Sequence, residues 1–249
     1  MLFGKKKKQP RPIDPPLGLC NLHCHILYGV DDGAKTEEQM YDLIKLEYSF
    51  GVRHLCFTPH YNPALFEPRP ARIAKSYELA ERFVEENLPD MQLYLGNEVF
   101  MRPDTIDRLR DRSCRPLGAS NTVLTEFHPQ TSWDDIRMYS VKLLGEGYTP
   151  LLAHIERYDK LSELDNIYEL KSLGVKFQIN TAAFESARRK LISKLIEEGL
   201  IDVVSDDRHN ETRGDPPIPE TYALIEERFG SVAAEAVFIR RPLNILNIS

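Results

Sequence analysis

Short apolar runs alternate with longer amphipathic stretches along the chain from residue 19 onward. Seven of the apolar runs have the length and composition of strands. They cover residues 19–24, 52–60, 91–99, 121–127, 149–155, 175–180 and 201–207. Stretches that predict helices follow them, at 36–51, 69–88, a short segment beginning at Pro103, 133–147, 162–173, 188–199 and 217–238.

The first predicted helix has clear end signals. Thr36 suits the N-cap, and Gln39 three residues later completes a capping box. Gly51 is typical of the residue that ends a helix.

The alternation itself predicts the fold class. Strands that alternate with helices of 10 to 15 residues form parallel sheets, because a parallel connection needs a crossover segment. The seven strand–helix units follow one another without a linker, and a length of 249 residues is normal for one α/β barrel. We therefore predict an α/β protein with barrel-like closure, rather than an open sheet or two domains.

Metal-binding side chains stand at the carboxyl end of nearly every predicted strand. They are, in chain order, His23 and His25, His60, Glu98, Glu126, His154, and the group Asp206, Asp207 and His209. Only the sixth strand ends in an amide, Asn180, and of the seven histidines only His54 lies away from a strand end. Because α/β barrels carry their active sites at this end, we expect these side chains to share one site.

The residue types point to metal ions. Imidazole and carboxylate together suit zinc, manganese or iron, and eight or nine ligands are too many for one ion. We therefore expect two or three divalent ions. His23 and His25 are two apart on a strand and point to one face, which leaves Cys24 for the core. Of Asp31 and Asp32, one can bind metal while the other shapes the turn, and Asp32 is the favoured ligand.

Composition and charge exclude several classes of protein. A net charge of −6 disfavours a general nucleic-acid surface, and no run of about 18 apolar residues predicts a membrane span. The start of the chain lacks the apolar core of a signal peptide, and the four cysteines show no paired spacing. We expect a cytoplasmic protein with reduced thiols. The basic run Lys5–Lys8 is read as a solvated terminus, with weak contact to an anionic membrane surface as the alternative.

A metal cluster of this size suits phosphate-ester hydrolysis, in which paired ions hold substrate oxygens and activate a water. The phosphate also needs a positive clamp, and Arg157, three residues after His154, is the best candidate. Arg208 and Arg213 lie near the last predicted strand and are secondary candidates for substrate binding.

The motifs HCHILYGVDDG, TPH, GNE, TEF, AHIERYD and SDDRHN together resemble the PHP superfamily, named for polymerase and histidinol phosphatase domains. Within it the chain is similar to the metal-dependent bacterial tyrosine-protein phosphatases of capsule and exopolysaccharide operons. The resemblance implies a single-domain, distorted (β/α)7 TIM-like barrel over residues 19–249, after a flexible basic segment at 1–18. It also implies two to three metal ions, manganese first, with iron or zinc as alternatives.

The resemblance assigns roles to individual residues. The implied metal ligands are His23, His25, Asp32, His60, Glu98, Glu126, His154, Asp207 and His209. The family motif has an aspartate two residues before its last histidine, so Asp207 is preferred, with Asp206 and a longer loop as the alternative. Arg157 matches the family arginine that contacts phosphate, whereas Arg213 is out of register.

The implied reaction is hydrolysis of phosphotyrosine by a metal-activated water, on the tyrosine-rich tail of a partner autokinase that controls polysaccharide export. No Cys-x5-Arg loop supports a cysteine nucleophile, and His60 or a water is the candidate proton donor. The rival activities are hydrolysis of a small molecule such as histidinol phosphate and, in another class, a metal-stabilised module that only binds the kinase tail. The sequence leaves the oligomeric state open.

Overall fold

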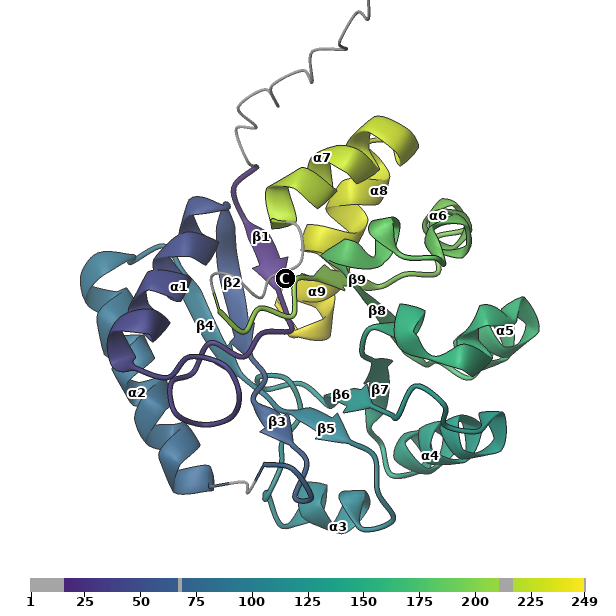
Figure 1. Cartoon of the computed structure of the whole chain (residues 1–249), viewed down its shortest axis with the longest axis horizontal. Coiled ribbons are helices and arrows are strands. Elements are labelled where there is room, and N and C mark those ends of the chain that lie inside the picture. The colour runs from purple at the N-terminus through teal and green to yellow at the C-terminus, as the bar shows by residue number, and fades with distance from the viewer. Residues whose placement is uncertain (1–15, 67–68, 211–216, 249) are drawn as a thin grey trace, which may run out of the picture.

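Strands and helices alternate along the chain in the computed structural model, which describes residues 16–66, 69–210 and 217–248 (Figure 1). The strands are β1 (Leu19–Asn21), β2 (Val52–Phe57), β3 (His60–Tyr61), β4 (Gln92–Leu95), β5 (Glu98–Phe100), β6 (Thr122–Glu126), β7 (Thr149–Leu152), β8 (Lys176–Asn180) and β9 (Val203–Ser205). The α-helices are α1 (Glu37–Ser49), α2 (Pro70–Asn87), α3 (Thr105–Arg110), α4 (Trp133–Gly145), α5 (Leu164–Ser172), α6 (Arg189–Glu197), α7 (Ile218–Phe229), α8 (Ser231–Glu235) and α9 (Arg241–Ile245).

The strands form two parallel sheets rather than one. The first has the order β1-β2-β4, and the second has the order β3-β5-β6-β7-β8-β9 and curls into half a barrel. The prediction of an α/β protein with seven strand–helix units is confirmed. One continuous seven-stranded barrel is not what the described residues form, because the second and third predicted strands are each broken in two.

The breaks have local causes. Pro59 has no N–H for the ladder, and it separates β2 from β3. Gly96 and Asn97 separate β4 from β5, and the Asn97 side chain donates to the Pro59 carbonyl at 2.9 Å. Beyond the breaks, β3 pairs with β5 in the register that sets His60 beside Glu98. The distortion therefore brings two of the expected site residues together.

The first and last strands meet along a seam instead of a regular ladder. Beyond β1 and β9, the segments 22–25 and 206–209 run side by side with an isolated parallel bridge between Cys24 and Arg208. The backbone N–H of His25 donates to the Arg208 carbonyl at 2.7 Å, and that of Asp207 donates to the His23 carbonyl at 3.1 Å. The two sheets thus meet where four expected ligands lie, which are His23, His25, Asp207 and His209.

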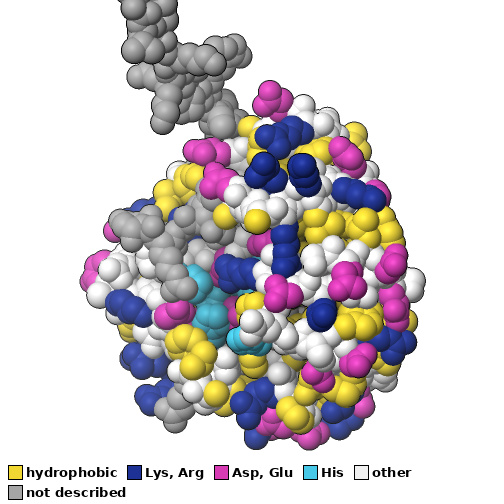
Figure 2. All heavy atoms as spheres, turned by 45° about the vertical axis from the view of Figure 1, so that its right-hand side comes forward, with side chains coloured by type: hydrophobic (Ala, Val, Ile, Leu, Met, Phe, Trp, Pro, Cys, Tyr) yellow, Lys and Arg dark blue, Asp and Glu magenta, His cyan; other side chains and the backbone are white. Residues whose placement is uncertain are grey.

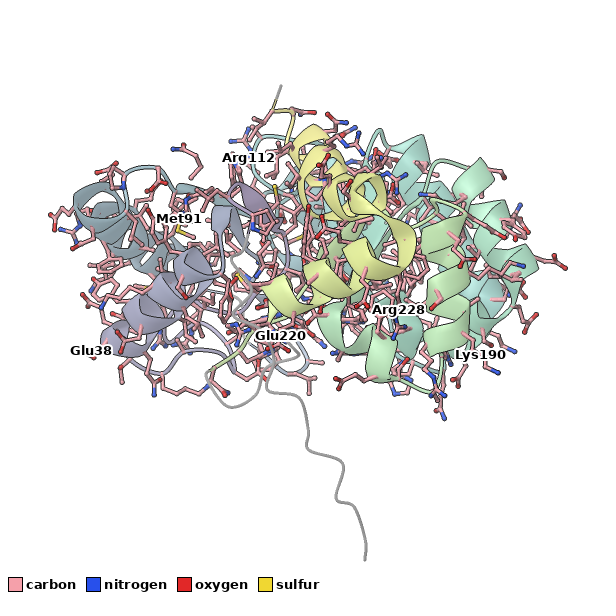
Figure 3. The ribbon with its side chains drawn as sticks, turned by 90° about the horizontal axis from the view of Figure 1, so that it is seen from above. Glu38, Met91, Arg112, Lys190, Glu220 and Arg228 are labelled. Carbon is pink, nitrogen blue, oxygen red and sulfur yellow. The ribbon has the colours of Figure 1, made fainter. Side chains whose placement is uncertain are left out.

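Two apolar layers hold the strands in place. A small inner cluster joins Cys20, Leu124 and Leu151 from the strands to Ile245 and Leu246 near the C-terminus. A larger cluster lies between the strands and the surrounding helices. The outer faces of those helices carry exposed charges such as Glu38, Lys190 and Arg228 (Figure 3).

The predicted helices agree with the described ones, with one exception. The Thr36 side chain accepts the Gln39 N–H and caps α1, while the Gln39 side chain accepts the N–H of Lys35. The predicted helix at 217–238 is wrong in one respect, because Gly230, at φ +88°, separates α7 from α8. Of the described helices, none combines the length and the apolar character that crossing a membrane requires. The basic run Lys5–Lys8 lies outside the described residues.

Candidate metal centre

Histidine side chains gather in one place on the molecular surface, with basic side chains beside them (Figure 2). They line a cavity of about 350 Å³ at the carboxyl ends of the strands. Seven predicted site residues besides Arg157 contribute to its wall, namely Asp32, His60, Glu98, Glu126, His154, Asp207 and His209.

Four buried side chains form the centre of the cluster. His23 Nε2 lies 3.3 Å from both Glu98 Oε1 and Asp207 Oδ1. His25 Nε2 lies 3.2 Å from Glu98 Oε2 and 3.3 Å from Asp207 Oδ1. The two Nε2 atoms are themselves 3.3 Å apart. Strand ends that are far apart in sequence thus point their ligand atoms at one small volume.

The cluster extends to either side of this centre. On one side, His154 Nε2 lies 2.9 Å from Glu98 Oε1 and 3.7 Å from Glu126 Oε1. On the other side, His209 Nε2 lies 3.3 Å from Asp32 Oδ1. The ligand atoms fall into four overlapping groups, and within each group they lie within 4.8 Å of one another. The groups are His25, Asp32, His60 and His209; His23, His25 and Asp207; His23, Glu98 and His154; and His60, Glu98 and Glu126.

Hydrogen bonds behind three imidazole rings determine which nitrogen faces the cluster. Nδ1 of His25 lies 2.7 Å from Asp31 Oδ2, Nδ1 of His209 lies 2.8 Å from the Asp207 carbonyl oxygen, and Nδ1 of His23 lies 3.3 Å from Gln178 Oε1. A neutral ring with its proton on Nδ1 presents a lone pair on Nε2. These lone pairs face each other and carboxylate oxygens at 3.2–3.3 Å, an arrangement that a divalent cation between them would satisfy. The residues therefore fit metal ions.

The electrostatics of the cluster point the same way. Burial, followed by the charge of Glu98, raises the pKa of Glu126 to about 8. Burial acts to lower the pKa of His25, but the charge of Asp31 and hydrogen bonds to carboxylates outweigh it and hold that pKa well above its usual value. Burial acts to raise the pKa of Asp207, but His23 and His25 hold it well below its usual range. The carboxylates thus favour positive charge beside them, which protons on the imidazoles supply without metal and which a divalent ion can supply instead.

The two aspartates of the first loop have different surroundings. Asp31 is inside the loop, where it accepts from the N–H of Gly33 at 3.0 Å and of His60 at 3.0 Å, besides facing His25. Asp32 faces the cavity. A Cβ at position 33 would lie 1.6 Å from the His25 carbonyl oxygen, so only glycine permits this approach. Cys24 is fully buried in the outer core, as predicted from its place between the two histidines.

Polar residues of β8 orient the ligands, although the sequence analysis gave them no role. The Gln178 side-chain oxygen accepts the His154 N–H at 2.6 Å, and its amide donates to Asn180 Oδ1 at 2.8 Å. Asn180 in turn donates to Asp207 Oδ2 at 3.0 Å. The sequence pattern that could have identified them is the pair of amides, Gln178 and Asn180, at alternate positions of one predicted strand.

The three predicted substrate-binding arginines differ in where they lie. Arg157 lines the cavity, and its Nη2 lies 2.9 Å from Asp207 Oδ2. Arg208 is buried and points away from the cavity, with its Nε 2.7 Å from Glu47 Oε1 and 2.8 Å from Asp206 Oδ2. Substrate contact by Arg208 therefore does not fit its position, because carboxylates inside the protein already surround its guanidinium. Arg213 lies outside the described residues.

The same geometry separates Asp206 from Asp207. Asp207 has a left-handed backbone, at φ +50°, which turns its carboxylate into the cluster. Asp206 is buried on the other side of the chain, where its Oδ1 accepts from Asn21 at 2.7 Å. His154 also has a left-handed backbone, at φ +35°. Such conformations in residues other than glycine are concentrated at functional sites.

Aromatic side chains form the rest of the cavity wall. Phe66, Phe100 and Phe127 line it, and the His60 ring stacks on Phe66 with centroids 4.8 Å apart. His128 also lines it, and its Nδ1 accepts the Gln130 N–H at 3.3 Å. None of these residues was predicted as part of the site, although Phe127 and His128 directly follow the predicted ligand Glu126.

A curled parallel α/β fold with a His/Asp/Glu cluster at its strand ends defines a protein with a candidate polynuclear metal centre. The model of a family described as "Capsular polysaccharide synthesis, CpsB/CapC" matches residues 19–247, and the chain belongs to this family. The predicted family is therefore confirmed.

Curated relatives and a solved structure are similar over most of the chain. Tyrosine-protein phosphatase CpsB of Streptococcus agalactiae serotype III (strain NEM316) is 31% identical over 238 residues, which cover 92% of this chain and 98% of that protein. Tyrosine-protein phosphatase YwqE of Bacillus subtilis (strain 168) is 26% identical over 223 residues, or 86% of each chain. A solved structure from work on YwqE and on CpsB of Streptococcus pneumoniae, "unique metal-dependent tyrosine phosphatases", matches with a TM-score of 0.82 at 24% identity, covering 92% of this chain and 95% of that chain. At that identity the structural match confirms the fold.

Proposed function

We propose that the protein is a metal-dependent phosphotyrosine phosphatase. The observation that carries the proposal is the convergence of histidine Nε2 lone pairs and carboxylates beside Arg157 in an aromatic-walled cavity. The names of the relatives, tyrosine-protein phosphatases, support it. We also propose that the two sheets are parts of one distorted (β/α)7 barrel of the PHP type, with its catalytic domain over residues 19–249.

The metal ligands in this proposal are the nine predicted residues. They are His23, His25, Asp32, His60, Glu98, Glu126, His154, Asp207 and His209. Two or three divalent ions, manganese first and iron or zinc as alternatives, would offset the negative charge of the carboxylates. When bound, such ions activate water and stabilise the charge on a phosphate under attack.

The protein's own residues orient the substrate. The Arg157 guanidinium is partly exposed at the cavity, and its fork suits two phosphate oxygens. Phe66, Phe100 and Phe127 offer apolar surface to the phenyl ring of phosphotyrosine. The leaving phenolate has a pKa near 10 and needs less proton assistance than an alkoxide. His60, at the cavity wall, or a water is the proposed proton donor.

We propose that the protein acts in the cytoplasm, on the phosphorylated, tyrosine-rich tail of a bacterial tyrosine autokinase that controls capsule or exopolysaccharide synthesis. Family membership supports this proposal. The aromatic wall favours an aryl phosphate over the short alkyl phosphates of serine and threonine.

A paired assay tests the function. The manganese-loaded protein is given a phosphotyrosine peptide and histidinol phosphate side by side, and the Arg157→Ala variant is given the same substrates. We expect a clear preference for the peptide, and a loss of about 100-fold in kcat/KM on removal of Arg157, the size of effect seen when one group that stabilises transition-state charge is deleted. The exposed Arg137→Ala change on α4 is the control.

Other outcomes would contradict the proposal in distinct ways. Preference for histidinol phosphate would assign the protein to small-molecule phosphatases. No hydrolysis by the wild-type protein, with Arg157→Ala altering only peptide binding, would indicate a binding module.

A further inference from the structure

A buried ionic network lies behind the seam that closes the barrel. Arg208 Nε contacts Glu47 Oε1 at 2.7 Å and Asp206 Oδ2 at 2.8 Å. The Asn21 amide joins the two carboxylates, at 3.2 Å from Glu47 Oε2 and 2.7 Å from Asp206 Oδ1. All four side chains are buried, and they come from α1, β1 and the segment after β9.

The network holds the residues on both sides of a proposed ligand. Asp206 and Arg208 flank Asp207, whose left-handed backbone at φ +50° carries its carboxylate into the metal cluster. With both neighbours anchored toward α1, residue 207 has little freedom to relax to an ordinary conformation. His209 follows directly, and its ring orientation depends on the Asp207 carbonyl.

The network also reaches the ligands of the first strand. Asn21 accepts the His23 N–H through its side-chain oxygen at 3.3 Å, and the Arg208 carbonyl accepts the His25 N–H at 2.7 Å. Among the described residues, no regular ladder joins β1 to β9 at this point. Side-chain contacts therefore supplement the few backbone hydrogen bonds that join the two segments.

We propose that Glu47, Asp206 and Arg208 are positioning residues that set the geometry of the metal ligands on both sides of the seam. The inference rests on the proposed function in one respect, that the cluster binds metal. Burying Arg208 with two carboxyl groups costs solvation energy, and apolar residues of similar volume often serve stability as well or better. The hydrogen bonds and ion pairs of the network are directional, so they fix the position of the ligands. Apolar packing has no directional contacts and would hold them less precisely.

The test compares variants that remove the network with a variant that removes a different ion pair. Arg208→Met removes the shared cation, and Glu47→Gln replaces one carboxyl group with an amide of the same shape. The control is Lys171→Met, because Lys171 pairs with Asp202 at 2.5 Å, between α5 and the segment before β9, and is not among the cluster residues. Each folded protein is stripped with chelator, titrated with Mn²⁺ alone, and then assayed for melting temperature, kcat and KM.

We expect Arg208→Met to weaken Mn²⁺ affinity by about 10- to 100-fold, the range for residues that orient metal ligands. We expect Glu47→Gln to weaken Mn²⁺ affinity by a smaller factor. Lys171→Met should change this affinity by less than about twofold, even if its melting temperature falls as far as that of the network variants. We also expect the loss of turnover in the network variants to appear mainly in kcat. If Arg208→Met does not fold, Glu47→Gln decides the question.

Two results have different meanings. Wild-type Mn²⁺ affinity in both network variants, with only the melting temperature reduced, would overturn the inference and leave the phosphatase proposal intact. A wild-type protein that binds Mn²⁺ without hydrolysing phosphotyrosine would overturn the proposed function, while weaker Mn²⁺ binding in the network variants would still support the inference.

Discussion

At the scale of single residues, the type of each site residue could be predicted, but its role within the site often could not. Histidines and carboxylates at strand ends identify the cluster because parallel strands end at one edge. The sequence does not show which neighbour a side chain contacts across the fold. Arg208 and Asp206 were plausible site residues by position, and tertiary contacts with Glu47 and Asn21 turn both away.

Asp31 gives a test of ligand orientation. It accepts from His25 Nδ1 at 2.7 Å and keeps the lone pair of Nε2 toward the cluster. We expect Asp31→Asn to weaken Mn²⁺ affinity by about tenfold or more, because the amide orients the ring less strongly than the carboxylate does. Calorimetric titration measures this affinity, and the exposed Asp42→Asn variant of α1 is the control. Unchanged affinity would mean that Asp31 serves only the turn.

His54 gives a test of pH dependence away from the site. Its half-buried ring lies with Nδ1 3.0 Å from the Tyr94 hydroxyl, and burial lowers the pKa of His54. The unfolded chain therefore takes up this proton at higher pH than the folded protein does, so stability falls as pH drops through about 6.5. Urea unfolding at several pH values should show a smaller fall in His54→Gln than in the wild type over that window. An equal fall would contradict the assignment.

At the scale of elements, the strand–helix alternation predicts order and direction well, because hydrophobic period and helix caps are local. It predicts interruptions poorly. Pro59 and Gly96, where the strands break, can be read from the sequence, yet their effect on sheet pairing depends on partners far along the chain. Those breaks bring His60 into register with Glu98, so the least predictable part of the sheet contributes to the site.

The loop after β1 shows how an element depends on one small residue. We expect Gly33→Ala to destabilise the protein by about 1–3 kcal/mol and to weaken metal binding, since its Cβ would meet the His25 carbonyl oxygen at 1.6 Å. Gly145→Ala at the end of α4 is the matched control, because nothing lies within 4 Å of its added Cβ. Denaturant unfolding measures both. Equal, small effects would show that the loop is less restricted than the geometry indicates.

At the scale of the whole molecule, the fold gathers buried carboxylates and histidines at the carboxyl ends of its strands. Carboxylates crowded in this way repel one another, so metal ions should stabilise the folded state. An ion present at 1,000 times its dissociation constant adds about 4 kcal/mol, which raises the melting temperature by roughly 10 °C for a protein of this size. Thermal unfolding with and without chelator measures the change, and no difference would argue against bound metal.

The central claim is that metal ions in the strand-end cluster enable hydrolysis of phosphotyrosine. The most direct measurement titrates chelator-stripped protein with Mn²⁺ while hydrolysis of a phosphotyrosine peptide is followed. We predict no turnover without metal and a rise that levels off at two to three ions per chain, in keeping with the overlapping ligand groups. Full turnover in the stripped protein, or none at any level of Mn²⁺, would contradict the claim.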